Sequence, residues 1–156
     1  MDEVEFVLNL LKQKGKTVAT AESCTGGMLG ELLTSIPGSS AVYPGGVITY
    51  CNELKQQVLG VDGALLKKSG AVCAQVAAQM AEGVRKLLGA DYGVSTTGVA
   101  GPGADDIGNP EGLVYIGVAG ERNTTVQELH LSGSRDMIRK QASQFVFIML
   151  IDALEA

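Results

Sequence analysis

The residues at 20–27, Thr-Ala-Glu-Ser-Cys-Thr-Gly-Gly, place a sharp turn between a β-like run and an amphipathic helical pattern. This order predicts a strand, a turn and a helix, with Ser23, Cys24 and Thr25 at the carboxyl end of the strand. Backbone N–H groups at a helix N-terminus lack partners and favour an anion or a developing oxyanion. A hydroxyl beside a thiol at such a turn gives two candidate nucleophiles, Ser23 and Cys24.

A structural role explains the same residues. Ser23 and Thr25 have the side chains that cap helix N-termini, and Cys24 can be a small buried hydrophobe. The pattern also differs from the Gly-x-Ser-x-Gly elbow that is typical of many hydrolases. Taken alone, the turn therefore leaves both interpretations open.

Length and composition predict one α/β domain over residues 1–156. The chain is 46% hydrophobic but only 4% aromatic and has no Trp, so its core is built from aliphatic residues, as in layered α/β folds. It has 12 Lys and Arg against 17 Asp and Glu, a formal charge of −5. This balance argues against nucleic acid or an anionic membrane as the main partner.

The cysteines predict reduced thiols in a cytoplasmic protein. There are three, an odd number, and the acidic N-terminus does not resemble a signal peptide. Cys24, Cys51 and Cys73 are too scattered to suggest a zinc site, so no metal is expected. The longest apolar run, residues 145–151, is too short to span a bilayer.

Hydrophobic periodicity and turn residues predict alternating helices and strands. We expect helices over residues 3–14, 26–36, 52–60, 62–69, 73–88 and from 136 onward, and strands over 16–22, 41–50, 91–98, 112–119 and 124–131. Pro44 and two glycines interrupt the second strand, which favours a bulge or an edge position over a regular central strand. The last two strands should form an antiparallel hairpin.

Lys55 occupies an unusual position for a lysine. With Asn52 as the expected N-cap, Lys55 falls at the third helical position, where the helix dipole disfavours a cation. The same dipole would lower its pKa, and a neutral lysine can act as the base for a serine. The only histidine, His130, lies in a predicted strand and is a poor candidate for this role. A surface position for Lys55, and a packing role for Tyr50, are the structural alternatives.

The last helix carries apolar residues on two sides. At 100° per residue Ile138, Ala142, Phe145 and Met149 share one face, whereas Phe147 and Ile151 point roughly the other way. Such a helix is either fully internal or contacts a partner subunit. We therefore expect a homo-oligomer.

A glycine-rich loop follows the strand that ends at Gly98. Its sequence over residues 96–103, Thr-Thr-Gly-Val-Ala-Gly-Pro-Gly, lets the backbone approach a ligand closely and offers N–H groups to a phosphate or carboxylate. It lacks the Lys of a Walker loop and the helix of a dinucleotide fingerprint. The loop alone can also be a simple turn.

Together these stretches resemble the CinA C-terminal domain, the nicotinamide-nucleotide amidase family. The resemblance runs in consistent order from about residue 4 to 154. It is carried by Glu-Ser-Cys-Thr-Gly-Gly at 22–27, Pro-Gly-Ser-Ser at 37–40, Gly-Val-Ile-Thr-Tyr at 46–50 with Asn52 and Lys55, Gly-Ala-Val at 70–72, Met-Ala-Glu-Gly at 80–83 and Thr-Gly-Val-Ala-Gly-Pro-Gly at 97–103.

The resemblance implies a three-layer α/β/α sandwich with a mixed sheet. It also implies hydrolysis of the carboxamide of nicotinamide mononucleotide, without metal or cofactor, by Ser23 acting with Tyr50 and Lys55. In our hypothesis neutral Lys55, directly or through Tyr50, accepts the serine proton, and helix N-terminal N–H groups around Cys24 to Gly26 hold the oxyanion. The expected substrate-binding residues are Cys24, Thr25, Gly26, Thr97, Gly98, Gly101, Gly103 and, for the 5′-phosphate, one of Arg135 and Arg139.

The sequence departs from the family pattern at two helix starts. Cys73-Ala74 stands where the family commonly has Ser-Glu, and Ser134 stands where Asp commonly precedes the arginine. Neither change touches the expected catalytic residues. Two other functions stay open: a non-catalytic nucleotide-binding or protein-interaction module, and a cysteine hydrolase that uses Cys24.

Overall fold

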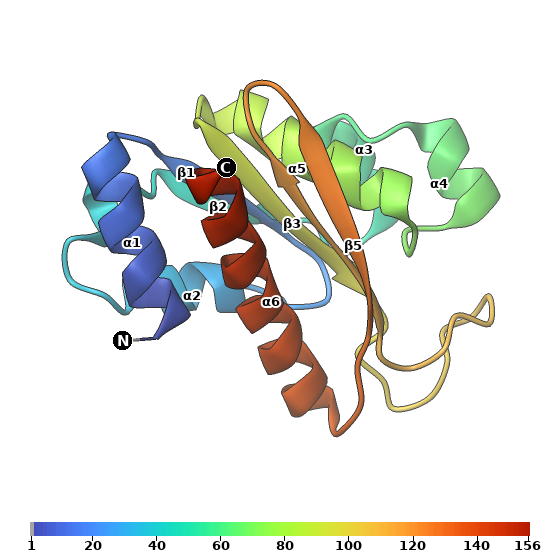
Figure 1. Cartoon of the computed structure of the whole chain (residues 1–156). Coiled ribbons are helices and arrows are strands. Elements are labelled where there is room, and N and C mark those ends of the chain that lie inside the picture. Colours follow the sequence, from blue (N-terminus) through green and yellow to red (C-terminus); the bar gives the residue numbers. More distant parts are fainter. Residues whose placement is uncertain (1) are drawn as a thin grey trace.

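A five-stranded mixed sheet forms the centre of the computed structural model, which describes residues 2–156 (Figure 1). Its order is β2-β1-β3-β4-β5; β2, β1 and β3 are parallel, whereas β4 pairs antiparallel with both β3 and β5. The strands are β1 (Val18–Glu22), β2 (Gly45–Ile48), β3 (Tyr92–Gly98), β4 (Leu113–Ala119) and β5 (Thr124–His130). The predicted mixed sheet, the edge position of β2 and the β4–β5 hairpin are confirmed.

Helices cover both faces of this sheet (Figure 1). They are α1 (Glu3–Lys14), α2 (Met28–Thr34), α3 (Asn52–Leu59), α4 (Gly63–Ser69), α5 (Ala74–Leu88) and α6 (Arg135–Glu155), with a short 3₁₀ turn at Ser39–Ala41. One apolar core lies under α1, α2 and α6, and a second lies under α3, α4 and α5. The fold is thus the predicted three-layer α/β/α sandwich.

Local sequence signals explain where several helices begin and end. The Asp2 carboxylate accepts from Glu5 N at the start of α1, and Gly15 ends the helix with a φ of 64°. Asp62 caps α4 and Ser134 caps α6 in the same way. Several expected boundaries were wrong by a few residues: β1 begins at Val18 rather than 16, α2 covers Met28–Thr34 rather than 26–36, and β2 covers Gly45–Ile48 rather than 41–50.

The parallel strands decide where a ligand site can form. Their carboxyl ends meet at one edge of the sheet, and β1 lies between β2 and β3. The chain after β1 forms α2 on one face, whereas the chain after β2 forms α3 to α5 on the other. A crevice therefore opens beyond the end of β1, which is the usual ligand position in open α/β sheets.

The prediction for the faces of α6 was partly wrong. Phe147 is only 1% exposed and belongs to the core, whereas Phe145 is 38% exposed. The helix lies against β3 and β4 on one side and against α1 and α2 on another, so it buries two faces within one chain (Figure 1). Phe147 therefore gives no support to a subunit interface.

Among residues 2–156, no helix combines the length and the hydrophobicity that a membrane span requires.

These two phenylalanines form a matched pair for a stability test. Phe147→Ala removes a ring from the packed core and should lower the free energy of unfolding by about 3–5 kcal/mol. Phe145→Ala should cost less than about 1 kcal/mol, because its ring is already partly solvated. Urea unfolding of both variants measures the difference, and equal losses would contradict this assignment of the α6 faces.

Candidate functional site

A cleft of about 620 Å³ lies at the carboxyl ends of the parallel strands. It is bounded by the turn after β1, the segment after β2, the link between α4 and α5, and the loop after β3. Nine expected site residues line it: Ser23, Cys24, Tyr50, Lys55, Thr97, Gly98, Gly101, Gly103 and Arg135. The remaining three, Thr25, Gly26 and Arg139, lie outside its lining.

Lys55 and Ser23 are in direct contact. Lys55 Nζ lies 3.0 Å from Ser23 Oγ and 2.6 Å from the carbonyl oxygen of Thr49. The lysine is only 1% exposed and is among the largest fully buried side chains, so the surface position is excluded. Ser23 comes from the end of β1 and Lys55 from α3, which brings together residues 32 positions apart.

The expected cap of α3 was wrong by one residue. Cys51 is the N-cap and makes no side-chain capping bond, so Asn52 is the first helical residue. Lys55 is therefore at the fourth helical position, and its own N–H donates to Cys51 O. The shift moves the ammonium away from the unpaired N–H groups, and burial rather than the dipole dominates its chemistry.

Burial lowers the pKa of the Lys55 amine below its ordinary value. The nearby thiols of Cys51 and Cys24 oppose this shift. No carboxylate contributes to the shift, so the amine lacks the partner that normally keeps a buried lysine charged. A larger share of Lys55 is thus neutral at a given pH than for a lysine in water.

The Thr49 carbonyl oxygen orients this amine. A carbonyl can only accept, so one N–H of Lys55 is directed at Thr49. Thr49 N in turn donates to Glu22 O at 2.9 Å, which fixes the segment after β2 against the end of β1. When the amine is neutral, its lone pair is free to accept the hydroxyl proton of Ser23.

A buried carboxylate, Glu22, organises the turn that carries Ser23. Its oxygens accept from Thr25 Oγ1 at 2.6 Å and from the N–H groups of Gly27, Leu29 and Gly30 at 2.9–3.1 Å. Charge-assisted bonds of this kind offset the cost of burying the carboxylate. They also occupy the N-terminus of α2, whose N-cap is Gly27 and offers no side chain.

These bonds fix the direction of a hydrogen-bond relay. Thr25 uses its single hydroxyl proton on Glu22, so in the 2.8 Å contact with Thr96 Oγ1 it must accept. Thr96 Oγ1 and the Thr96 carbonyl then accept from Ser23 N at 3.3 and 3.1 Å. The backbone of Ser23 is therefore anchored to β3 on one side and, through two threonines, to Glu22.

The expected oxyanion donors require a correction. The N–H groups of α2 are held by Glu22, and Gly26 N donates to Ser23 O at 3.0 Å. Gly26 and the helix N-terminus therefore do not provide free donors. In the described chain, the N–H groups of Cys24 and Thr25, the two central residues of this turn, donate no hydrogen bond to another residue.

Of the two expected routes for the serine proton, the contacts favour direct transfer to Lys55 over transfer through Tyr50. The Tyr50 ring is 61% exposed, and its hydroxyl accepts from Arg135 Nη2 at 3.0 Å. Arg135 also donates to the carbonyl oxygen of Gly101. Tyr50 and Arg135 thus form one wall of the cleft beside the glycine-rich loop.

The second arginine expected to bind phosphate lies elsewhere. Arg139 donates through Nε to Cys24 O at 3.2 Å and through Nη2 to Thr25 O at 2.8 Å. Its guanidinium therefore contacts the backbone of the turn outside the cleft. Of the two arginines, only Arg135 lines the cleft.

The alternative nucleophile and base are disfavoured by their surroundings. Burial raises the pKa of the Cys24 thiol to about 11, which keeps it protonated and weakly reactive near neutral pH. His130 lies on β5, separated from β1 by two strands, and contacts Glu128 at 2.6 Å. In the chain from residue 2 onward, no three His, Cys, Asp or Glu side chains group as metal ligands do.

Sequence reasoning missed the residues that support the turn. Glu22 and Thr96 lie in the segments 20–27 and 96–103, but the sequence predicted no role for either. A glutamate just before a helix whose N-cap is glycine could have indicated the buried cap. Thr96 gave no comparable signal, because its role depends on the pairing of β1 with β3.

A family model described as the CinA C-terminal domain matches residues 2–154. A putative competence-damage inducible protein from Caldanaerobacter subterraneus is 48% identical over 151 residues, or 97% of this chain and 37% of that protein. A CinA-like protein from Thermosynechococcus vestitus is 54% identical over 130 residues, which is 83% of this chain and 31% of that protein. The chain thus spans about a third of the length of these relatives.

Solved structures show the same fold over nearly the whole chain. A competence/damage inducible protein from Agrobacterium tumefaciens has a TM-score of 0.93 and 37% identity, covering 99% of this chain and 94% of that one. A CinA superfamily protein from Klebsiella pneumoniae has a TM-score of 0.94 and 30% identity, covering 99% of each. The arrangement of sheet and helices is therefore that of known proteins.

The buried amine predicts a particular dependence of stability on pH. The native pKa of Lys55 is lowered, whereas in the unfolded chain it is about 10.4, so the unfolded state binds more protons between these values. The free energy of unfolding should therefore rise with pH across this window, relative to Lys55→Met, by at most about 1.4 kcal/mol per pH unit. Urea unfolding of wild type and Lys55→Met from neutral pH to about pH 10 measures how the free energy of unfolding of each protein changes with pH. The same change in both proteins would contradict the lowered pKa of Lys55.

Proposed function

The chain belongs to the CinA C-terminal domain family, and we propose that it hydrolyses the carboxamide of nicotinamide mononucleotide to nicotinate mononucleotide and ammonia. The observation that carries this proposal is the buried Lys55 amine 3.0 Å from Ser23 Oγ. This pair supplies a nucleophile and a base without a histidine. The substrate class comes from the family resemblance, and the chemistry follows from the contacts.

Acylation begins with proton transfer inside this pair. Neutral Lys55 accepts the proton of Ser23, and Oγ attacks the carboxamide carbon, so the carbonyl electrons move to the oxygen. The tetrahedral intermediate collapses when its C–N bond breaks and Lys55 returns the proton to the departing nitrogen, releasing ammonia. A water molecule, deprotonated by Lys55, then cleaves the ester and restores the Ser23 hydroxyl.

The N–H groups of Cys24 and Thr25 are the proposed oxyanion donors. They belong to the turn that carries the nucleophile, and neither donates to another residue within the described chain. A buried N–H without a partner is costly, so the substrate oxygen or water is expected to meet these groups. Donors held in advance in a site with little water can lower a barrier by several kcal/mol.

The rest of the cleft suits a phosphorylated nucleotide. Its volume of about 620 Å³ lies within the range of small-molecule sites. Gly101 and Gly103 have φ values of 83° and 81°, which bend the loop into one wall of the cleft; the N–H of Gly103 already donates to Glu111 Oε1 at 2.9 Å. We assign Arg135 to the 5′-phosphate, because it lines the cleft whereas Arg139 does not.

A non-catalytic role is the second candidate. The relatives named as competence-damage inducible proteins carry no reaction in their names, and a cleft with these residues can hold a nucleotide without turnover. The two candidates differ in one observable, the release of ammonia.

Ser23→Ala and Cys24→Ala provide a direct comparison. Wild type and Cys24→Ala should release ammonia from nicotinamide mononucleotide at similar rates, because the buried thiol is protonated. Ser23→Ala should lose at least about 10³-fold in kcat, because the nucleophile is absent. A coupled ammonia assay measures all three proteins, with circular dichroism as the control for folding.

Two outcomes would reject parts of this proposal. Loss of activity in Cys24→Ala with full activity in Ser23→Ala would make Cys24 the nucleophile. Nucleotide binding by calorimetry without ammonia release from wild type would support the non-catalytic module.

A further inference from the structure

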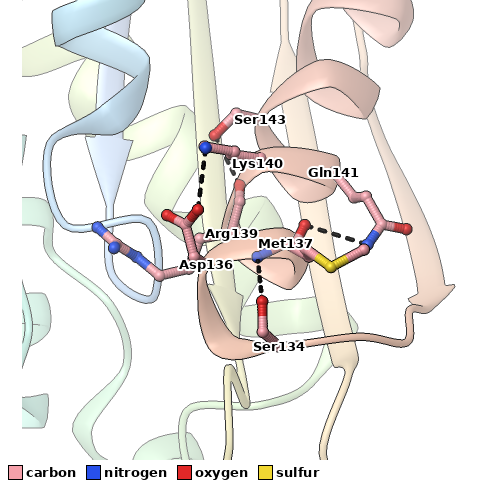
Figure 2. Close-up of polar contacts among 7 residues, drawn as sticks. All are labelled: Ser134, Asp136, Met137, Arg139, Lys140, Gln141 and Ser143. Atoms are coloured by element: carbon pink, nitrogen blue, oxygen red, sulfur yellow. Dashed lines mark hydrogen bonds and ion pairs between the residues drawn. The ribbon is translucent and has the colours of Figure 1, made fainter.

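Arg139 holds the nucleophile turn by its backbone and lies outside the cleft lining. It lies one turn into α6 and reaches the loop between β1 and α2, 114 residues away in sequence (Figure 2). Ser23 and Cys24 line the cleft, whereas Arg139 does not. Among residues 2–156 its guanidinium forms no ion pair; the nearby Asp136 pairs with Lys140 at 2.9 Å. Two carbonyl oxygens of the turn are its hydrogen-bond partners.

The two bonds fix two successive peptide planes. In a trans peptide the C=O and the following N–H point in opposite directions. The hydrogen bond from Arg139 to the carbonyl oxygen of Thr25 therefore directs the N–H of Gly26 back into the turn, where it donates to Ser23 O. The hydrogen bond from Arg139 to the carbonyl oxygen of Cys24 likewise directs the N–H of Thr25 away from α6. In the described chain this N–H donates to no other residue.

Gly26 allows the guanidinium to approach this closely. Its φ is 60°, and a Cβ there would lie 3.3 Å from Arg139 Nη2. A charged donor on a carbonyl also polarises the peptide and strengthens the N–H on its other side. The glycine and the arginine thus belong to one arrangement that prepares a backbone donor.

We propose that Arg139 is a positioning residue that orients the Cys24–Thr25 peptide so that its N–H can stabilise the oxyanion formed by attack of Ser23. This inference rests on the proposed amidase function. It assigns the two arginines of α6 different tasks, because Arg135 lies in the cleft and Arg139 acts through the backbone. Arg139 should therefore affect the chemical step and Arg135 should affect substrate binding.

Arg139→Gln tests this division, with Arg135→Gln and Lys140→Gln as matched losses of one charge on the same helix. We expect Arg139→Gln to lower kcat by about 10- to 100-fold with KM within about 2-fold, less than the loss of a whole oxyanion donor. Arg135→Gln should mainly raise KM, and Lys140→Gln should leave both constants unchanged, because its exposed ion pair contributes little.

Chemical rescue separates positioning from a general loss of structure. Guanidinium ion, added below denaturing concentrations, should restore part of kcat in Arg139→Gln, whereas equal ionic strength of sodium chloride should not. Arg139→Lys should retain intermediate activity, because an ammonium cannot hold both carbonyls in the planar fork of a guanidinium. A rise in KM with unchanged kcat, or a loss that guanidinium does not rescue, would overturn the inference.

A second measurement does not depend on the nucleotide. Phenylmethanesulfonyl fluoride labels an activated serine: Ser23 Oγ attacks the sulfur, fluoride leaves and Lys55 takes the serine proton. Mass spectrometry of the intact protein measures the rate at which the adduct forms. Labelling should be at least about 10-fold slower in Arg139→Gln than in Lys140→Gln. If wild type is labelled but releases no ammonia, the amidase proposal fails while this comparison still decides the role of Arg139. Equal labelling rates, or no labelling of wild type, would overturn it.

Discussion

The contact between a buried amine and a serine hydroxyl is the interaction on which the site depends. Lys55 is almost fully buried, and burial favours its neutral form, which is the form that can accept a proton. The same burial is costly for the charged form and for the fold. The protein reduces this cost with the Thr49 carbonyl and Ser23 Oγ, the two contacts that also aim the amine.

The fold supports this contact by holding one short turn from several elements. Glu22 anchors the turn to α2, Thr96 anchors it to β3, and Arg139 anchors it to α6. Each partner uses a different polar group of the turn, which leaves the Ser23 hydroxyl and two backbone N–H groups for chemistry. The last helix is therefore part of the site as well as of the core, because its buried face fixes the position of Arg139.

Local patterns predicted much of this structure. The strand–turn–helix around Ser23, the hairpin and the layered architecture follow from periodicity, glycine and proline positions and the family resemblance. Lys55 could be singled out because a lysine early in a helix is unfavourable on local grounds. The cleft does bring Ser23 and Lys55 together, although the expected cap at Asn52 was wrong.

The errors concern side chains whose partners are distant in sequence. Arg139 reaches the turn across 114 residues, and Phe147 is buried because α1 and α2 cover a second side of α6. Helical periodicity showed apolar residues on two sides of α6, but it could not show whether the second side packs within the chain or against a partner subunit. Glu22 was missed for a similar reason, because a buried carboxylate is recognisable only once its donors are in place.

The most direct test of the central claim is to identify the covalent intermediate. Wild-type protein turning over nicotinamide mononucleotide would be quenched in acid within the first turnover and digested for peptide mass spectrometry. We predict that the acyl group of nicotinate mononucleotide is attached to Ser23. Attachment to Cys24, or rapid ammonia release with no adduct at any time, would contradict the account of Ser23 as a nucleophile activated by Lys55.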